Sequence, residues 1–218
     1  MIKLTKTLAR SFAKGKPKIH RQDMPLYEFV PIYSYSSYVA PSATLVGEAR
    51  ISEQAYILGN TVVRGDLNRA HVGSNSLVME NCSISTVHRH PDSAEIMDCD
   101  IGDDVVIAPG CSLISCQVDE LTYIGANSVI CEGAEIGKDV FIGPNSVVPP
   151  NRKIPDGQVW AGNPVRFIRN TLKADKAAFI ELRHAIFNDI RVTRREEVDT
   201  GAVYLSKCLS DFEEKVKL

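Results

Sequence analysis

Aliphatic residues return every six positions along the middle of the chain, from Val39 to Ile154. A helix repeats every 3.6 residues and a half-buried strand alternates, so neither produces a repeat of six. A parallel β-helix does, because each short strand contributes one large inward side chain before the chain turns a corner. The repeat consists of Val39, Leu45, Ile51, Ile57, Val63, Val72, Val78, Ile84, Ile101, Ile107, Leu113, Ile124, Ile130, Ile136, Ile142, Val148 and Ile154, with Val118 one position early.

Small or β-branched residues follow four positions after most members of this repeat. Three such strands make a triangular coil of about eighteen residues, with the small side chains packed inside near each corner. The sequence therefore predicts a left-handed parallel β-helix of hexapeptide repeats, a triangular prism, over residues 39–160. The second set comprises Ala43, Ala49, Ala55, Thr61, Ser76, Cys82, Val105, Cys111, Thr122, Ser128, Ala134, Val140 and Ser146.

The predicted solenoid is flanked by shorter segments of different character. Residues 23–38 are rich in aromatic residues and proline, which favours an extended lead-in over the first coil. Residues 161–192 begin with a Gly and Pro turn and continue with apolar residues at helical spacing from Leu172. We expect this α-helix to pack along the prism and to shield its edge strands. Residues 193–218 form a tail with a short amphipathic helix that docks on the chain itself or on a partner.

The repeat has one long interruption, between Ile84 and Ile101. The intervening residues are expected to bulge out as a loop, and loops on a rigid scaffold commonly carry function. This loop contains His88 and His90, a His-x-His pair that can chelate a metal if both rings point the same way. The two are weak metal candidates, because a zinc site needs further ligands that the loop does not clearly supply.

Residues 1–22 form a basic, amphipathic N-terminal arm without Asp or Glu. Leu4, Leu8 and Phe12 recur at helical spacing, with basic residues on the other side. This pattern is typical of a mitochondrial presequence, and a disordered basic tail is the alternative. We expect the segment to be retained as an anchoring arm.

Bulk composition excludes several classes of protein. Over 218 residues the net charge is −2, which argues against a nucleic-acid binder that works by charge alone. No apolar stretch is long enough to cross a bilayer. The six cysteines form no CxxC pair, and Cys82 and Cys111 fill small-residue positions of the repeat. Thiols packed in this way suit a reducing compartment, either the cytosol or the mitochondrial matrix.

Several stretches resemble the γ-class carbonic anhydrase family. They are VVRGDLNRAHVGSNS, IGDDVVIAPGCSLISC, YIGANSVICEGAEIG and the exit segment IPDGQVWAGNPVRFIR, and the likeness covers about residues 35–190. In that family the prism forms trimers. The Arg and Asp of its Arg-Gly-Asp element make ion pairs between subunits, and here these residues are Arg64 and Asp66. The alternative is a solvated surface pair of little energetic value.

The chain departs from this family at the metal. Family enzymes bind zinc between two subunits through three histidines, and the corresponding positions here are Ser85, Pro109 and Ile114. Proline and isoleucine offer no side-chain donor atom, and serine is a poor zinc ligand. Without the metal there is no activated water. The resemblance therefore implies no metal, no cofactor and no catalysis at this seam.

The resemblance implies a non-catalytic, carbonic anhydrase-like structural subunit of mitochondrial complex I (NADH:ubiquinone oxidoreductase). Such subunits form heterotrimers with other γ-carbonic anhydrase-like chains. They lie on the matrix side of the inner membrane, peripheral to it, against membrane-arm subunits. Alternatives are an active zinc γ-carbonic anhydrase, a scaffold subunit of another large complex, and a hexapeptide acyltransferase. The last would need His71 as general base, and His71 is otherwise expected to be an outward-facing surface residue.

Overall fold

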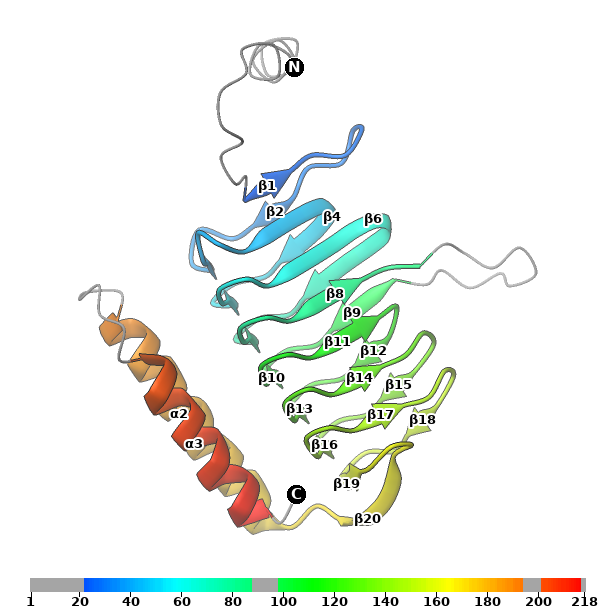
Figure 1. Cartoon of the computed structure of the whole chain (residues 1–218), viewed down its shortest axis with the longest axis vertical. Helices are drawn as coiled ribbons and strands as arrows, with labels where there is room; N and C mark the ends of the chain where they lie inside the picture. The colour runs from blue at the N-terminus through cyan, green and yellow to red at the C-terminus, as the bar shows by residue number, and fades with distance from the viewer. Residues whose placement is uncertain (1–21, 88–97, 194–200, 217–218) are drawn as a thin grey trace.

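The chain folds into a parallel β-solenoid of about seven turns, with two helices along one side (Figure 1). The computed structural model describes residues 22–87, 98–193 and 201–216. The predicted arm lies outside these residues except for Gln22, and so do His88 and His90. The solenoid confirms the predicted fold, and the hexapeptide repeat fits its left-handed form.

The strands stack into two sheets that make up the three faces of the prism. In the larger sheet the long strands β4 and β6 bend through a corner, so two faces join there. Its strands are β1 (Asp23–Met24), β2 (Ile32–Tyr33), β4 (Thr44–Ile51), β6 (Val62–Val72), β8 (Ser83–Ser85), β9 (Cys99–Ile101), β11 (Ser112–Ile114), β12 (Gln117–Val118), β14 (Val129–Ile130), β15 (Glu135–Ile136), β17 (Val147–Val148) and β18 (Lys153–Ile154).

The smaller sheet forms the third face, which we call the helix face. Its strands are β3 (Tyr38–Val39), β5 (Tyr56–Ile57), β7 (Leu77–Val78), β10 (Val106–Ile107), β13 (Tyr123–Ile124), β16 (Phe141–Ile142), β19 (Gln158–Ala161) and β20 (Arg166–Asn170). We call the other two faces the β8 face (β8, β11, β14, β17 and the start of β6) and the β9 face (β9, β12, β15, β18 and the end of β6). Among the described strands all pairings are parallel except that of β19 with β20.

The core is the column of inward side chains that the repeat predicts. Every aliphatic member is buried except Val39, which is half-buried at the first coil. The small residues near the corners are buried too, and their hydroxyl groups are satisfied: Thr61 donates to the carbonyl of Met79 at 2.7 Å and Ser128 to that of Gly143 at 3.1 Å. These two buried hydroxyl groups are therefore paired, as stability requires.

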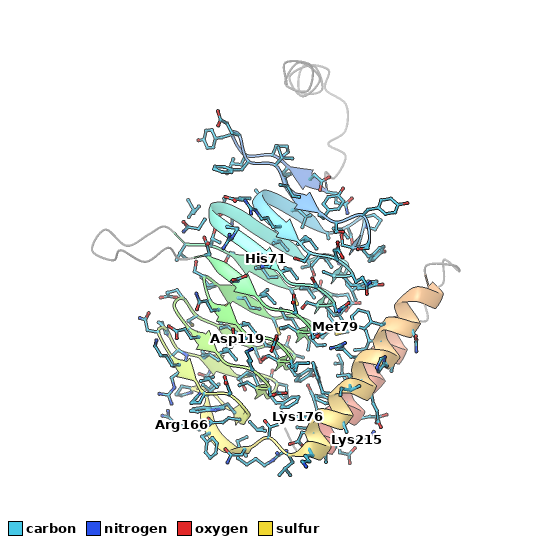
Figure 2. The ribbon with its side chains drawn as sticks, turned by 180° about the vertical axis from the view of Figure 1, so that it is seen from behind. His71, Met79, Asp119, Arg166, Lys176 and Lys215 are labelled. Carbon is cyan, nitrogen blue, oxygen red and sulfur yellow. The ribbon has the colours of Figure 1, made fainter. Side chains whose placement is uncertain are left out.

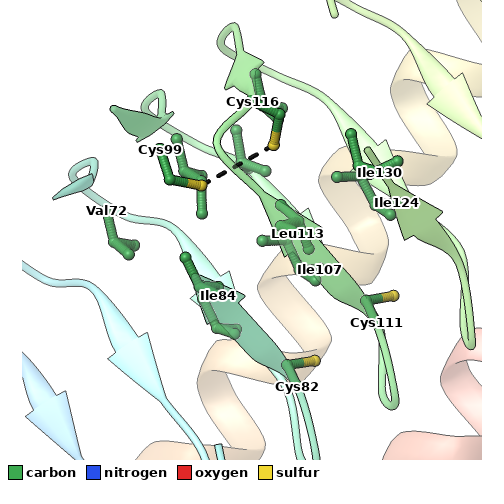
Figure 3. Packing of buried hydrophobic residues seen from close by; sticks show 14 of the residues in the cluster. Val72, Cys82, Ile84, Cys99, Ile107, Cys111, Leu113, Cys116, Ile124 and Ile130 are labelled. Carbon is green, nitrogen blue, oxygen red and sulfur yellow. Dashed lines mark hydrogen bonds between the residues drawn. The ribbon is translucent and has the colours of Figure 1, made fainter. Parts of the chain in front are cut away.

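The thiols also pack inside, as free cysteines. Cys82 and Cys111 stack in successive coils beside the aliphatic column (Figure 3). Nearer the opposite corner, the sulfur atoms of Cys99 and Cys116 lie 3.9 Å apart. Cys82 and Cys111 thus take the small-residue role that the repeat assigns to them.

The edge between the β8 face and the β9 face, here the β8–β9 edge, is the irregular one. The long interruption of the repeat falls there, between β8 and β9, and residues 88–97 of the predicted loop lie outside the described residues. One coil later the same edge is one residue short, since Val106 pairs with Tyr123, 17 positions on, whereas Tyr123 pairs with Phe141, 18 positions on. The short turn passes through Ser115, whose φ is 36°. The missing residue at this edge accounts for the early position of Val118, and the core residues that follow remain in register.

Helices α2 (Lys173–Thr193) and α3 (Gly201–Val216) lie against the helix face (Figure 1). Phe179, Leu182 and Ile186 of α2 pack with Phe212 of α3 and with outward residues of the sheet such as Phe141. Among the described residues, neither helix is both long and apolar enough to cross a membrane.

The predicted C-terminal helix is confirmed, and it packs along the prism, but two details differ from the expectation. The helices cover a face of the prism and not its edge strands, because the outward residues of that face are themselves apolar. Leu172 is exposed and precedes the helix, where its backbone N–H donates to the carboxylate of Asp175 at 2.7 Å. That bond satisfies a donor just before the first turn of α2. The tail helix docks on the chain itself, through Leu209, Phe212 and Val216.

Candidate functional site

The positions that correspond to zinc ligands lie before and at the end of β11 and at the end of its neighbour β8. Ser85 and Ile114 are direct register partners on β8 and β11, so their side chains belong to one column of the β8 face. Pro109 precedes β11, in the turn after β10, where its carbonyl accepts the N–H of Asn127 at 2.9 Å. One chain therefore brings two of the three positions together and holds the third at another edge of the prism.

The donor atoms at these positions do not fit a zinc ion. Ser85 offers one hydroxyl oxygen, whereas the side chains of Pro109 and Ile114 are hydrocarbon. Protein zinc is held by imidazole, thiolate or carboxylate groups, usually with tetrahedral geometry. Within the described ranges, no group of three His, Cys, Asp or Glu side chains is placed to hold a metal ion.

Arg64 and Asp66 lie next to this column, on β6. Arg64 is the register partner of Ser85, and its guanidinium pairs with the carboxylate of Asp66 two residues on. The Arg64 side chain is 53% exposed and that of Asp66 is 16% exposed. Within one chain the two side chains therefore form an ion pair with each other. Their pairing with a neighbouring subunit stays a prediction.

A second polar constellation lies on the β9 face, around His71. Figure 2 shows His71 on the solenoid, away from the two helices. Its Nδ1 atom lies 2.7 Å from Oδ1 of Asp100, and its Nε2 atom lies 2.9 Å from Oγ of Ser52. The residue faces outward as predicted, but it is not an isolated surface residue. Its ring is held on both sides and its side chain is 33% exposed.

The charge of Asp100 fixes the protons in this chain of hydrogen bonds. The hydrogen bond from His71 lowers the pKa of the Asp100 carboxyl; partial burial opposes this shift, and the nearby charges of His71 and Arg69 add to it. An ionised carboxylate only accepts hydrogen bonds. Nδ1 of His71 therefore carries a proton, and in the neutral form of the ring Nε2 accepts the hydroxyl proton of Ser52.

These side chains line an open pocket of about 560 Å³. Two arginines belong to it, and each is anchored by a carboxylate: Arg50 by Glu48 at 2.7 Å and Arg69 by Asp98 at 3.1 Å. A guanidinium has five N–H donors, so each retains donors beyond its anchor. The lining consists of Ile32, Arg50, Ile51, Ser52, Arg69, His71 and Asp100.

The sequence interpretation did not single out Ser52 or Asp100. The signal was present, because Ile51, Val72 and Ile101 are inward members of the repeat and are register partners in the structure. The residues just before them, Arg50, His71 and Asp100, must then stack in one outward column. The long interruption before Ile101 hid this alignment, because the number of residues between Val72 and Ile101 is not that of a regular coil.

Comparison with known proteins agrees with this architecture. The family model described as "Bacterial transferase hexapeptide (six repeats)" matches residues 115–150. The chain is 34% identical over 161 residues to "Gamma carbonic anhydrase 1, mitochondrial" of Arabidopsis thaliana, a match that covers 74% of this chain and 58% of the relative. It is also 29% identical over 150 residues to the carnitine operon protein CaiE of Escherichia coli K12, covering 67% and 73% of the two chains.

The chain thus has a hexapeptide-repeat architecture and is similar to mitochondrial γ-carbonic anhydrases of Arabidopsis thaliana. Among solved structures it is similar to the product of the BC4754 gene of Bacillus cereus, described as a "putative acetyltransferase", with a TM-score of 0.69, 26% identity and coverage of 88% and 97% of the two chains. A hexapeptide transferase family protein of Anaplasma phagocytophilum shares the fold, with a TM-score of 0.70 and 22% identity. The chain spans little more than half the length of the Arabidopsis relative.

Proposed function

We propose that this chain is a non-catalytic, carbonic anhydrase-like structural subunit of mitochondrial complex I. In this proposal it forms a heterotrimer with other γ-carbonic anhydrase-like subunits, on the matrix side of the membrane arm. One observation carries the proposal: the solenoid is intact, while the positions of the family's zinc ligands hold Ser85, Pro109 and Ile114. A scaffold kept without its metal donors is most simply explained by the surfaces it offers.

The faces of the prism support an assembly role. The helices cover one face only, and within the described residues the β8 face has no such cover. Arg64 and Asp66 lie on that face, beside the column of Ser85 and Ile114. A directional pair of opposite charges at this place suits a contact that fixes how neighbouring prisms are rotated.

The cellular placement rests on two independent observations. The basic, acid-free and amphipathic residues 1–22 have the pattern of a mitochondrial presequence. Relatives that match this chain, including one at 34% identity, are mitochondrial γ-carbonic anhydrases. Both support a mitochondrial location, and the matrix side of the inner membrane follows only from the proposed partners.

The proposal is tested on mitochondria by native gel electrophoresis with an epitope-tagged copy of the chain. The tag is expected to migrate with complex I and to be recovered with other γ-carbonic anhydrase-like subunits. Migration apart from the complex would contradict the assembly. Metal analysis of the purified chain tests the missing donors separately, and one tightly bound zinc per chain with CO₂ hydration would restore the catalytic alternative.

A further inference from the structure

The three polar residues of the β9 face are linked in a particular order. Nδ1 of His71 bonds the carboxylate of Asp100, and Nε2 of the same ring bonds the hydroxyl of Ser52, from which it accepts when the ring is neutral. The residues come from three successive coils, so the order is set by the stacking of the solenoid. A nucleophile within hydrogen-bond reach of a base, which a third group orients, is the arrangement that activates a serine.

Several features make the hydroxyl of Ser52 available for chemistry. It lines the open pocket of about 560 Å³ together with His71 and Asp100. The register places Gly73 and then Gly102 at the positions below Ser52 in the next two coils, so the residues stacked directly under Ser52 have no side chain. The neighbouring strand ends are tied by backbone hydrogen bonds, such as that from Ser52 N–H to the carbonyl of Val72 at 2.9 Å.

The pocket also holds positive charge for a substrate. The guanidinium groups of Arg50 and Arg69 line it, each anchored by a carboxylate and each with N–H donors to spare. Fixed donors of this kind can stabilise negative charge that develops on a reacting carbonyl oxygen. They can also bind a carboxylate or phosphate group that the substrate already carries.

We propose that Ser52, His71 and Asp100 form an acyl-transfer site that hydrolyses a carboxylic ester bearing a negatively charged group. This activity would be separate from the assembly role, because it uses the β9 face and not the column of Ser85 and Ile114. It needs no metal and no cofactor.

The reaction follows from the positions of the protons. Oγ of Ser52 attacks the ester carbonyl carbon while its proton passes to Nε2 of His71; the bond to the alcohol oxygen breaks, and His71 returns the proton to the departing oxygen. Water then attacks acyl-Ser52 in the same way, giving its proton to His71. The bond to Oγ breaks, Oγ regains a proton, and the carboxylic acid leaves. Asp100 stays ionised and stabilises the charged imidazole ring.

The decisive experiment is covalent labelling of the purified full-length chain with a fluorophosphonate, followed by mass spectrometry of the peptides. We expect one adduct, on Ser52, which is absent from Ser52→Ala. We expect His71→Ala and Asp100→Asn to slow labelling at least about tenfold, because each removes a part of the base. Circular dichroism of every variant separates a lost site from a lost fold.

Ser34→Ala provides a matched control. Ser34 occupies the equivalent place one coil earlier, but its hydroxyl lies 3.2 Å from Oγ of Ser36 and not beside an imidazole. Its removal should leave the labelling of Ser52 unchanged. The proposal is overturned if the folded chain gives no adduct on Ser52, or if His71→Ala and Asp100→Asn are both labelled at the normal rate. Either result would make the three residues a structural link between coils.

Turnover of two model esters tests the class of substrate. Mono-p-nitrophenyl succinate carries a carboxylate, whereas p-nitrophenyl acetate has the same leaving group without one. We expect kcat/KM for the succinate ester to be several-fold higher than for the acetate ester. Arg50→Gln should abolish this preference by raising the KM for the succinate ester. Equal rates for the two esters in the unmodified chain would overturn the assignment of an anionic substrate.

Discussion

At the corners of the prism, single residues adopt a backbone conformation that most side chains avoid. On the two regular edges the non-glycine turn residues have φ between 53° and 59°, whereas Gly110 and Gly157 at equivalent turns have φ of 75° and 66°. Asparagine and aspartate tolerate this left-handed region, because their short polar side chains can bond locally. They fill most of these places in the sequence: Asn60, Asn75, Asn81, Asp104, Asn127, Asp139 and Asn145, with Gln54 and Leu121 as the others.

Asn145 offers a direct test of this conformational requirement, because its side chain is exposed and buries no core surface. Replacing it by valine should lower the free energy of unfolding by about 1–2 kcal/mol, the cost of a β-branched residue in the left-handed region. Replacement by glycine should be close to neutral. Urea denaturation of the three proteins measures both changes, and equal losses for valine and glycine would point instead to a lost side-chain contact.

The carboxyl of Asp100 should make stability depend on pH. Its pKa is lowered in the folded chain, chiefly by the hydrogen bond from His71. A lowered pKa means that its contribution is present above the unfolded value of about 3.9 and disappears as the pH falls through the folded value. Asp100→Asn should therefore be less stable than the unchanged chain at pH 7. The difference should shrink as the pH falls through the lowered pKa and the carboxyl becomes protonated, and thermal melts at several acidic pH values will show this.

At the scale of elements, the helix pair is held by aromatic contacts. The ring of Phe212 on α3 lies 4.7 Å from that of Tyr123 and 6.0 Å from that of Phe141, between centroids, and also contacts Phe179 of α2. The hydroxyl of Tyr123 donates to the carboxylate of Glu213 at 3.0 Å. Phe212 thus connects α3 both to the sheet and to α2.

Phe212→Ala should therefore release α3 more than it disturbs the solenoid. Removing a buried phenylalanine costs about 3 kcal/mol or more. We expect amide hydrogen exchange to accelerate strongly in residues 209–216 and little in the strands. Glu214→Ala, an exposed position on the same helix, is the control and should leave exchange unchanged. Uniform acceleration over the whole chain would mean that helix and solenoid unfold as one unit.

The elements also show how far the sequence could predict the structure. The repeat of inward residues predicted the solenoid, because few other folds bury one aliphatic residue per short strand. The covered face was missed although its signal is plain: outward positions such as Tyr56, Leu77, Val106, Tyr123 and Phe141 are apolar there. An interpretation built on inward positions alone did not use them.

The candidate sites differ in the same way. Ser85 and Ile114 could be placed together because both belong to unbroken runs of the repeat. The contact of His71 with Asp100 crosses the long interruption, so counting residues could not reveal it. Side-chain hydrogen bonds depend on a register that only the folded backbone establishes.

At the scale of the whole molecule, the bare β8 face is where assembly is proposed. Arg64→Ala or Asp66→Ala should weaken it, since leaving one charge unpaired in a partly buried contact costs about 2–5 kcal/mol. The isolated chain should hardly change, because an exposed pair contributes little to its own fold. Size-exclusion chromatography with light scattering on the chain, alone and co-expressed with its proposed partners, measures the first effect, and a thermal melt measures the second.

Lys138→Ala supplies the control for that experiment. Lys138 pairs with Glu120 at 2.8 Å at an exposed position away from the β8 face. Its loss removes a positive charge, as the loss of Arg64 does, without touching the proposed contact. Unchanged assembly of both the Arg64 and Asp66 variants would leave them as an ordinary solvated pair.

The β8–β9 edge gives the solenoid a place where chain length can vary. The connection from Ser85 to Cys99 is long in one coil and a residue is missing in the next, yet the buried column continues through both. Lengthening a surface loop is inexpensive, about 0.6 kcal/mol for each doubling. A foreign peptide grafted at this edge should therefore be displayed without loosening the prism, whereas the same graft in the uniform turns of the other two edges would disrupt every stack above and below it.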